Sequence, residues 1–207
     1  MNSFTVIDEN NWKRREHCAV FRNYVEPSFC MTVELDVTEF LATLRDEGYS
    51  FTMSMIWLVS KCANEIEEFR YRFLSERVVL FDKIDTSFAY MDEGDDLFKM
   101  VTVPFRDSMR EYVQEATRAA RAQKVYFPSP PGIDVFQFSP IPWVTYTHIS
   151  HTNPGRKNNV TPMFDWGRYR ERDGRVVMPF SVQVHHSFVD GIHVGHLVEN
   201  IQAYMDE

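Results

Sequence analysis

The chain has 207 residues, of which 44% are hydrophobic and 25% charged, a balance that allows a buried core and excludes a disordered chain. A net charge of −8 argues against nucleic acid or an anionic membrane as the main partner. No apolar run approaches a membrane span, the N-terminus lacks a basic-then-apolar signal, and the three cysteines are widely spaced. We therefore predict a single domain over residues 1–207 of a cytoplasmic protein.

In the first third of the chain the apolar periodicity predicts both strands and helices. Thr38 is expected to cap one helix and Gly48 to end it. The next helix is apolar on most sides, which is typical of a central helix packed on a sheet. The predicted elements are a strand at 4–7, a helix at 11–21, a strand at 29–37 and helices at 38–46 and 53–67.

Strands dominate the rest of the chain. The Asp173-Gly174 pair between two apolar runs is a clear hairpin signal, and Asp107 or Ser108 can cap a polar helix that runs to about residue 124. The predicted strands are 69–74, 77–81, 86–91, 98–103, 135–139, 144–150, 163–169 and 175–185. With helices between and after these strands, the pattern indicates an α/β sandwich.

The most informative stretch is residues 178–194, where a strand leads through a turn into a helix. The turn holds His185, His186, Asp190 and Gly191. A strand that carries an imidazole to its own end holds that ring rigidly, as a general base requires. A carboxylate four residues after His186 can orient the ring or fix the loop. The alternative is a strand end with two solvated histidines, a capping Asp and a turn Gly.

His185, His193 and His196 also suggest a metal site, because two of them share a helix face. A catalytic zinc site needs three well-placed ligands with supporting partners, and a general base must keep its lone pair free. We therefore predict no metal.

Three distant stretches together resemble the chloramphenicol acetyltransferase family. They are residues 11–17 (Asn-Trp-Lys-Arg-Arg-Glu-His), residues 139–143 (Ser-Pro-Ile-Pro-Trp) and residues 178–194 with His-His-x-x-x-Asp-Gly. The resemblance implies an acetyl-CoA-dependent O-acetyltransferase that works as a homotrimer. It also implies a two-layer α/β sandwich with a mixed, mostly antiparallel sheet and helices on one face.

The resemblance assigns catalytic roles to four residues. His186 is the general base, and Ser139 donates a hydrogen bond to the oxyanion. Arg14 pairs with Asp190 and holds the catalytic loop. The alternatives are a solvated basic face for Arg14 and a hydroxyl that satisfies its own turn for Ser139.

The resemblance also places residues around the two substrates. Trp143, Arg168 and Tyr169 fall beside the coenzyme, although an exposed Arg and a core Tyr remain the alternative for the last two. The acceptor pocket is assigned to Phe21, Phe29, Phe127, His151, Asn153 and Asp165. Several of these depart from the family pattern: Phe21 lacks a hydroxyl, His151 and Asn153 are polar, and Asp165 adds a negative charge. We therefore expect chloramphenicol to be a poorer acceptor than usual and a cationic or hydrogen-bond-donating acceptor to be favoured.

Three other functions compete with this interpretation. The first is a family acyltransferase with a more polar acceptor and little chloramphenicol activity. The second is the catalytic core of dihydrolipoyl acyltransferases, which has a similar motif but is joined to a lipoyl-type domain that this chain lacks. The third is a trimeric binding protein that has lost catalysis, which would not need the four catalytic candidates together.

Overall fold

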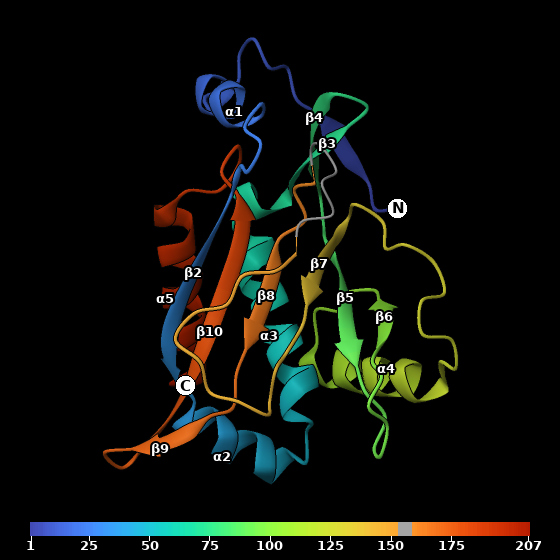
Figure 1. Cartoon of the computed structure of the whole chain (residues 1–207), viewed down its shortest axis with the longest axis vertical. Helices are drawn as coiled ribbons and strands as arrows, with labels where there is room; N and C mark the ends of the chain where they lie inside the picture. The colour runs from blue at the N-terminus through green and yellow to red at the C-terminus, as the bar shows by residue number, and fades with distance from the viewer. Residues whose placement is uncertain (153–158) are drawn as a thin grey trace.

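The computed structural model describes residues 1–152 and 159–207. Its main feature is a seven-stranded sheet in the order β2-β10-β8-β7-β5-β6, with β9 paired to β10 (Figure 1). Strands β5, β7 and β8 are parallel to one another, and the other pairs are antiparallel, which confirms the predicted mixed sheet. The strands are β2 (Ser28–Asp36), β5 (Asp85–Tyr90), β6 (Lys99–Val103), β7 (Val135–Phe138), β8 (Met163–Trp166), β9 (Arg170–Arg172) and β10 (Arg175–His185).

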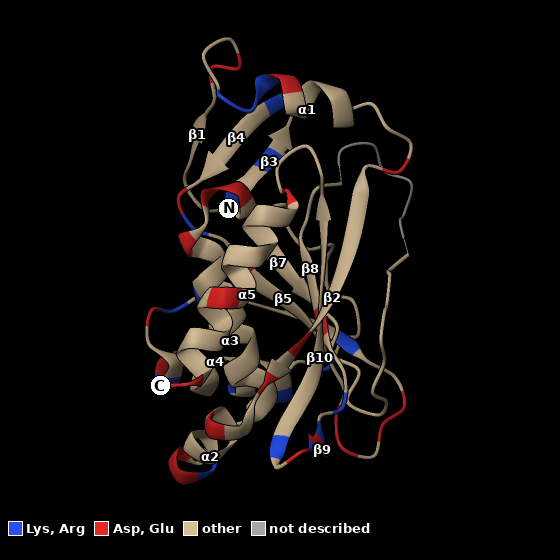
Figure 2. Ribbon diagram, turned by 90° about the vertical axis from the view of Figure 1, so that its left-hand side faces the viewer, with Lys and Arg blue, Asp and Glu red and all other residues tan. Residues whose placement is uncertain are grey.

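The helices α3, α4 and α5 cover one face of this sheet (Figure 2). Helix α3 is buried on nearly all sides because it lies against the sheet between α4 and α5, which explains its apolar sequence. In the described residues no helix combines the length and the apolarity that a bilayer crossing demands. The helices are α1 (Arg15–Phe21), α2 (Thr38–Glu47), α3 (Phe51–Glu65), α4 (Met109–Ala122) and α5 (Gly191–Met205).

A smaller sheet consists of β1 (Phe4–Val6), β4 (Arg77–Phe81) and β3 (Tyr71–Leu74), and the short helix η1 (Glu67–Arg70) leads directly into β3. Arg72 of β3 is buried, and its guanidinium donates to the carbonyls of Phe69, Tyr71, Ile133 and Val135. It therefore ties the small sheet to the start of β7.

Two helix starts differ from the prediction. Helix α1 begins at Arg15, not Asn11, because the Asp8 carboxylate accepts from the Asn10 amide and the Asn11 side chain and stabilises a turn. Thr38 is the first residue of α2 and does not cap it, since Asp36 Oδ1 accepts from the Thr38 amide at 3.0 Å. The predicted cap at Ser108 is confirmed.

The predicted strand at 144–150 is absent. This segment crosses the sheet instead of running along a neighbour, and its carbonyls have other partners. Val144 O accepts from the Arg168 amide at 2.7 Å, and Ile149 O accepts from Cys30 Sγ at 2.8 Å. The local sequence has the alternation of a strand, but the segment pairs with neither edge strand of the sheet, β2 or β6.

The strand register decides which side chains share the helix-free face. Paired residues point to the same side of a sheet. Thr32, Ser181 and Asp165 are therefore neighbours in one row, which Ser139 extends because its amide donates to Phe164 O at 3.2 Å. The adjacent row on the same face consists of Cys30, Gln183, Met163 and Gln137. This face is thus polar, whereas the aromatic side chains of β7 and β8 fill the core beneath it.

Candidate active site

The loop between β10 and α5 is held by one arginine. Arg14 binds both carboxylate oxygens of Asp190, at 2.7 and 2.6 Å, and donates further to the carbonyls of Ser187 and His186 at 2.9 and 3.2 Å. The predicted Arg14–Asp190 pair is therefore confirmed. The guanidinium lowers the pKa of Asp190, which keeps the carboxylate charged.

His186 is fixed in this loop by its backbone and by two aromatic rings. Its amide donates to Pro27 O at 2.9 Å, Phe21 stacks on its ring at a centroid distance of 4.0 Å, and Phe29 packs at 5.0 Å. Nδ1 lies 3.0 Å from Asp190 Oδ1, although not in hydrogen-bond geometry. The nearby carboxylate favours a proton on Nδ1 and leaves Nε2 free to accept one.

Ser139 lies just beyond the end of β7 with an available hydroxyl. Its Oγ makes no hydrogen bond to a described residue, and its amide is bound to Phe164 O. The alternative in which the hydroxyl satisfies its own turn is therefore not observed, and the group can donate to a ligand.

Asp165 lies beside Ser139 on the next strand and is only 1% exposed. Its Oδ2 is 2.6 Å from His151 Nε2, whereas its Oδ1 has no hydrogen-bond partner among the described residues. Burial raises the pKa of Asp165, and the carboxylate raises the pKa of His151. Both shifts favour a proton within the pair, so the negative charge expected at Asp165 has a partner in His151.

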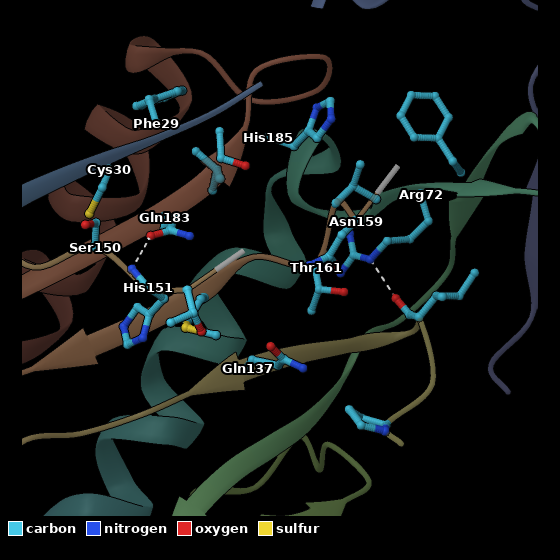
Figure 3. A pocket seen from close by; sticks show the side chains of 18 of the residues that line it. Phe29, Cys30, Arg72, Gln137, Ser150, His151, Asn159, Thr161, Gln183 and His185 are labelled. Carbon is cyan, nitrogen blue, oxygen red and sulfur yellow. Dashed lines mark hydrogen bonds between the residues drawn. The ribbon is translucent and has the colours of Figure 1, made fainter. Parts of the chain in front are cut away.

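A cavity of about 640 Å³ opens on the polar face of the sheet (Figure 3). Its lining includes His151, Cys30, Gln183, Gln137, His185 and Arg72. The last five were not predicted as site residues. The alternation of β10 was a usable signal for Gln183 and His185, because it places them on the same face as Ser181.

The three residues assigned to the coenzyme lie together on an exposed surface. The Arg168 amide bond to Val144 O joins the stretch that carries Trp143 to the end of β8, and Trp143 is 59% exposed. Tyr169 is also exposed and packs against Phe51, so the core tyrosine alternative is not observed. Two exposed rings beside a cation suit a ligand that carries both an aromatic base and phosphates.

The remaining predicted acceptor residues are less well defined. Phe127 is exposed and packs edge-on against Phe98 at 5.6 Å, outside the cavity lining. Asn153 lies outside the described residues.

His193, one of the histidines considered for a metal site, has two polar partners near the loop. His193 Nδ1 accepts from the Asp190 amide at 2.9 Å, and its Nε2 lies 3.4 Å from Glu68. Over residues 1–152 and 159–207, no group of three or more His, Cys, Asp or Glu side chains is placed to hold a metal ion.

The base and the oxyanion donor lie far apart within one chain. Ser139 and Ser181 lie in the same row of the sheet, two strands apart, so their Cα atoms are about 10 Å apart. His186 follows Ser181 by about 17 Å along β10 at roughly 3.3 Å per residue. The two Cα atoms are therefore about 19 Å apart, and the structure does not bring these two predicted residues together.

Comparison with known proteins decides the family. The family model for "Chloramphenicol acetyltransferase" matches residues 1–202. The chain belongs to the chloramphenicol acetyltransferase family. It is 30% identical over 205 residues to a chloramphenicol acetyltransferase of Proteus mirabilis, with coverage of 98% of this chain and 94% of the relative. It is 29% identical to chloramphenicol acetyltransferase 2 of Haemophilus influenzae over 209 residues, which cover 99% and 98% of the two chains.

Solved structures agree with this assignment. A chloramphenicol acetyltransferase structure matches with a TM-score of 0.90 and 28% identity over 98% of this chain and 100% of the other. A probable dihydrolipoamide acetyltransferase from Listeria monocytogenes matches with a TM-score of 0.64 and 16% identity over 92% and 88%. At 16% identity, the similarity to the dihydrolipoamide acetyltransferase shows only that the two proteins share a fold. The family membership confirms that the chain is an acyltransferase enzyme.

Proposed function

We propose that this protein transfers the acetyl group of acetyl-CoA to a hydroxyl of chloramphenicol or a related small acceptor. Family membership and the names of the relatives support this substrate pair. The exposed Trp143, Arg168 and Tyr169 form the proposed coenzyme surface.

Direct transfer fits the chemistry of the proposed residues. His186 Nε2 takes the proton of the acceptor hydroxyl, and the resulting oxygen nucleophile attacks the thioester carbonyl carbon. Ser139 Oγ–H donates to the tetrahedral oxyanion. When the C–S bond breaks, the CoA thiolate takes the proton from His186, and the acetyl ester is released. Arg14 and Asp190 keep the base in place throughout.

The observation that carries the proposed assembly is the separation of about 19 Å between His186 and Ser139 in one chain. Side-chain rotation cannot close such a distance across a rigid sheet. The site is therefore proposed to lie between subunits. Because the resemblance to the family implies a homotrimer, His186 of one subunit would meet Ser139 of the next. Exposed apolar side chains near the His186 end support a subunit contact there: Val20, Tyr24, Val25 and Ile192.

A complementation experiment tests the shared site. His186→Ala and Ser139→Ala are each expected to be nearly inactive alone. When the two variants are unfolded and refolded together, some interfaces pair an intact His186 with an intact Ser139. Thiol release from acetyl-CoA in the presence of chloramphenicol should then reappear, at up to roughly a quarter of the parent rate if subunits mix at random. The two variants refolded separately and then combined are the control. Inactive mixed assemblies would contradict a site shared between subunits.

The lining of the cavity favours acceptors more polar than chloramphenicol. His151 presents a polar ring there, and burying an unpaired polar group against an apolar ring costs roughly 1–3 kcal/mol. The specificity constant for chloramphenicol should be lower than that of the Proteus mirabilis enzyme assayed alongside. An equal value would show that His151 does not contact the drug.

A further inference from the structure

The His151–Asp165 pair raises an electrostatic problem for the proposed reaction. The tetrahedral intermediate carries a negative charge beside Ser139. Asp165 lies opposite Ser139 on the adjacent strand, with about 5 Å between the two Cα atoms. The Ser139 amide itself influences the Asp165 carboxyl and lowers its pKa, against the larger effect of burial. A bare carboxylate at this place would oppose the oxyanion.

We propose that His151 is a positioning residue for catalysis, which neutralises the buried Asp165 so that the oxyanion at Ser139 meets no opposing charge. The inference rests on the proposed role of Ser139. The Nε2–Oδ2 distance of 2.6 Å and the nearly complete burial of Asp165 carry it. A pair that shares one proton has a net charge of zero, whichever of the two groups carries that proton.

The backbone of His151 is fixed to support this contact. Its amide donates to Gln183 Oε1 at 2.8 Å, and Gln183 stands in the row next to Asp165 on the sheet (Figure 3). The loop that carries His151 is anchored again at Ile149 O by Cys30 Sγ. The loop that places the His151 imidazole beside Asp165 is therefore hydrogen-bonded to both β10 and β2.

Other ionisable groups face the pair from the elements around it. Burial raises the pKa of Cys30 on β2 to about 11 and that of Tyr146 in the preceding loop to about 12. Burial lowers the pKa of His185 on β10 to about 4. Arg72 and Glu26 are the charged residues elsewhere in the cavity lining. With these pKa values, Cys30, Tyr146 and His185 keep their charge states between pH 6 and 9.

Three variants separate charge compensation from packing. His151→Leu removes the compensating group, Asp165→Asn removes the charge, and the double variant removes both. At a pH above the raised pKa of Asp165 the unpaired carboxyl ionises, and kcat of His151→Leu should fall by tenfold to a hundredfold. The double variant should return to within about threefold of the parent. His148→Leu, on the exposed part of the same loop, is the matched control and should leave the rate unchanged.

The pH profile and the kinetic constants distinguish a charge effect from a packing effect, because loss of packing alone would change neither in the way described below. The deficit of His151→Leu relative to the double variant should grow as pH rises through the raised pKa of Asp165, because the carboxyl gains its charge there. The loss should appear in kcat and not in KM for the acceptor, since the charge acts on the transition state. Equal rates for His151→Leu and the double variant at every pH, or a parent-like rate for His151→Leu, would overturn the proposal.

Failure of the proposed function can be told apart from failure of this inference. If Ser139→Ala reacts as fast as the parent, Ser139 is not the oxyanion donor and both ideas fall. If Ser139→Ala is slow but His151→Leu is not, Ser139 keeps its proposed role, and only the proposal that His151 neutralises Asp165 is refuted. NMR titration of the His151 ring adds a test without activity: its pKa should drop in Asp165→Asn, and an unchanged value would overturn the pair itself.

Discussion

Replacement of Arg14 by methionine should destabilise the protein by about 3 kcal/mol. Methionine retains the apolar stem but removes the guanidinium. Two charge-assisted bonds to Asp190 and two bonds to carbonyls are lost. A hydrogen bond to a charged group contributes about 1.5–3 kcal/mol, and the side-chain exposures of 12% for Arg14 and 29% for Asp190 allow water to replace part of that.

The expected change in melting temperature follows from the size of the chain. The entropy of unfolding is about 2.1 cal/mol/K per residue, or about 0.43 kcal/mol/K for 207 residues. A loss of 3 kcal/mol therefore lowers Tm by about 7 °C. Calorimetry at equal subunit concentrations is the measurement, because assembly makes Tm depend on concentration.

A surface ion pair provides the control for this experiment. Lys61 and Glu65 lie four residues apart on α3 and are largely exposed. Pairs of this kind contribute about 0.3–0.5 kcal/mol, so Lys61→Met should lower Tm by about 1 °C. An Arg14→Met shift no larger than that of Lys61→Met would refute the idea that Arg14 holds the catalytic loop.

The effect of Arg14→Met should also depend on pH in a defined direction. Arg14 lowers the pKa of folded Asp190 below its unfolded value of about 3.9. The stabilisation is therefore complete above the unfolded pKa and is lost as pH falls through the folded one. The Tm difference between parent and variant should be constant from pH 6 to 8 and should shrink below about pH 5. A difference that grows on acidification would contradict this.

Three further predictions concern other parts of the chain. His186→Ala should lower kcat by about 10²–10⁴-fold with Tm within about 2 °C of the parent, and a variant that keeps a tenth of the rate would remove His186 from the base role. In Gly167→Ala the new Cβ would lie 2.8 Å from Val144 O, so KM for acetyl-CoA should rise severalfold; an unchanged KM would separate this contact from coenzyme binding. Arg72→Met leaves four carbonyls without their donor and should cost about 3 kcal/mol or more in urea unfolding, whereas a parent-like midpoint would show that Arg72 is dispensable.

The sheet and its catalytic strand could be predicted because their signals are local. The alternation of β10 and the Asp173-Gly174 turn predicted the hairpin of β9 and β10, and both turn residues adopt positive φ, at 52° and 78°. The prediction at 144–150 was wrong for a reason the local sequence does not contain. Alternation shows that a segment can be a strand, but whether it pairs with a neighbouring strand depends on the path that the rest of the fold gives it.

The candidate site was only partly readable from the sequence. The Arg14–Asp190 contact came from family resemblance, since nothing local links an arginine near the N-terminus to a C-terminal loop. His151 and Asp165 were both predicted near the acceptor, but their mutual contact depends on how the loop after Trp143 crosses the sheet. Arg72 was missed because the sequence does not distinguish it from the other arginines of this hairpin, and its burial is evident only from its carbonyl partners.

The position of β10 links assembly to chemistry. This strand carries Ser181 into the row beside Asp165 and Ser139, and it ends at the loop that holds His186. Within the proposed trimer one rigid strand therefore joins two different active sites, contributing to the oxyanion side of one and the base of the other. A small shift of β10 would displace groups in both sites together. Because base and donor are separated by fixed sheet geometry, an isolated subunit would hold every catalytic residue and still lack a complete site.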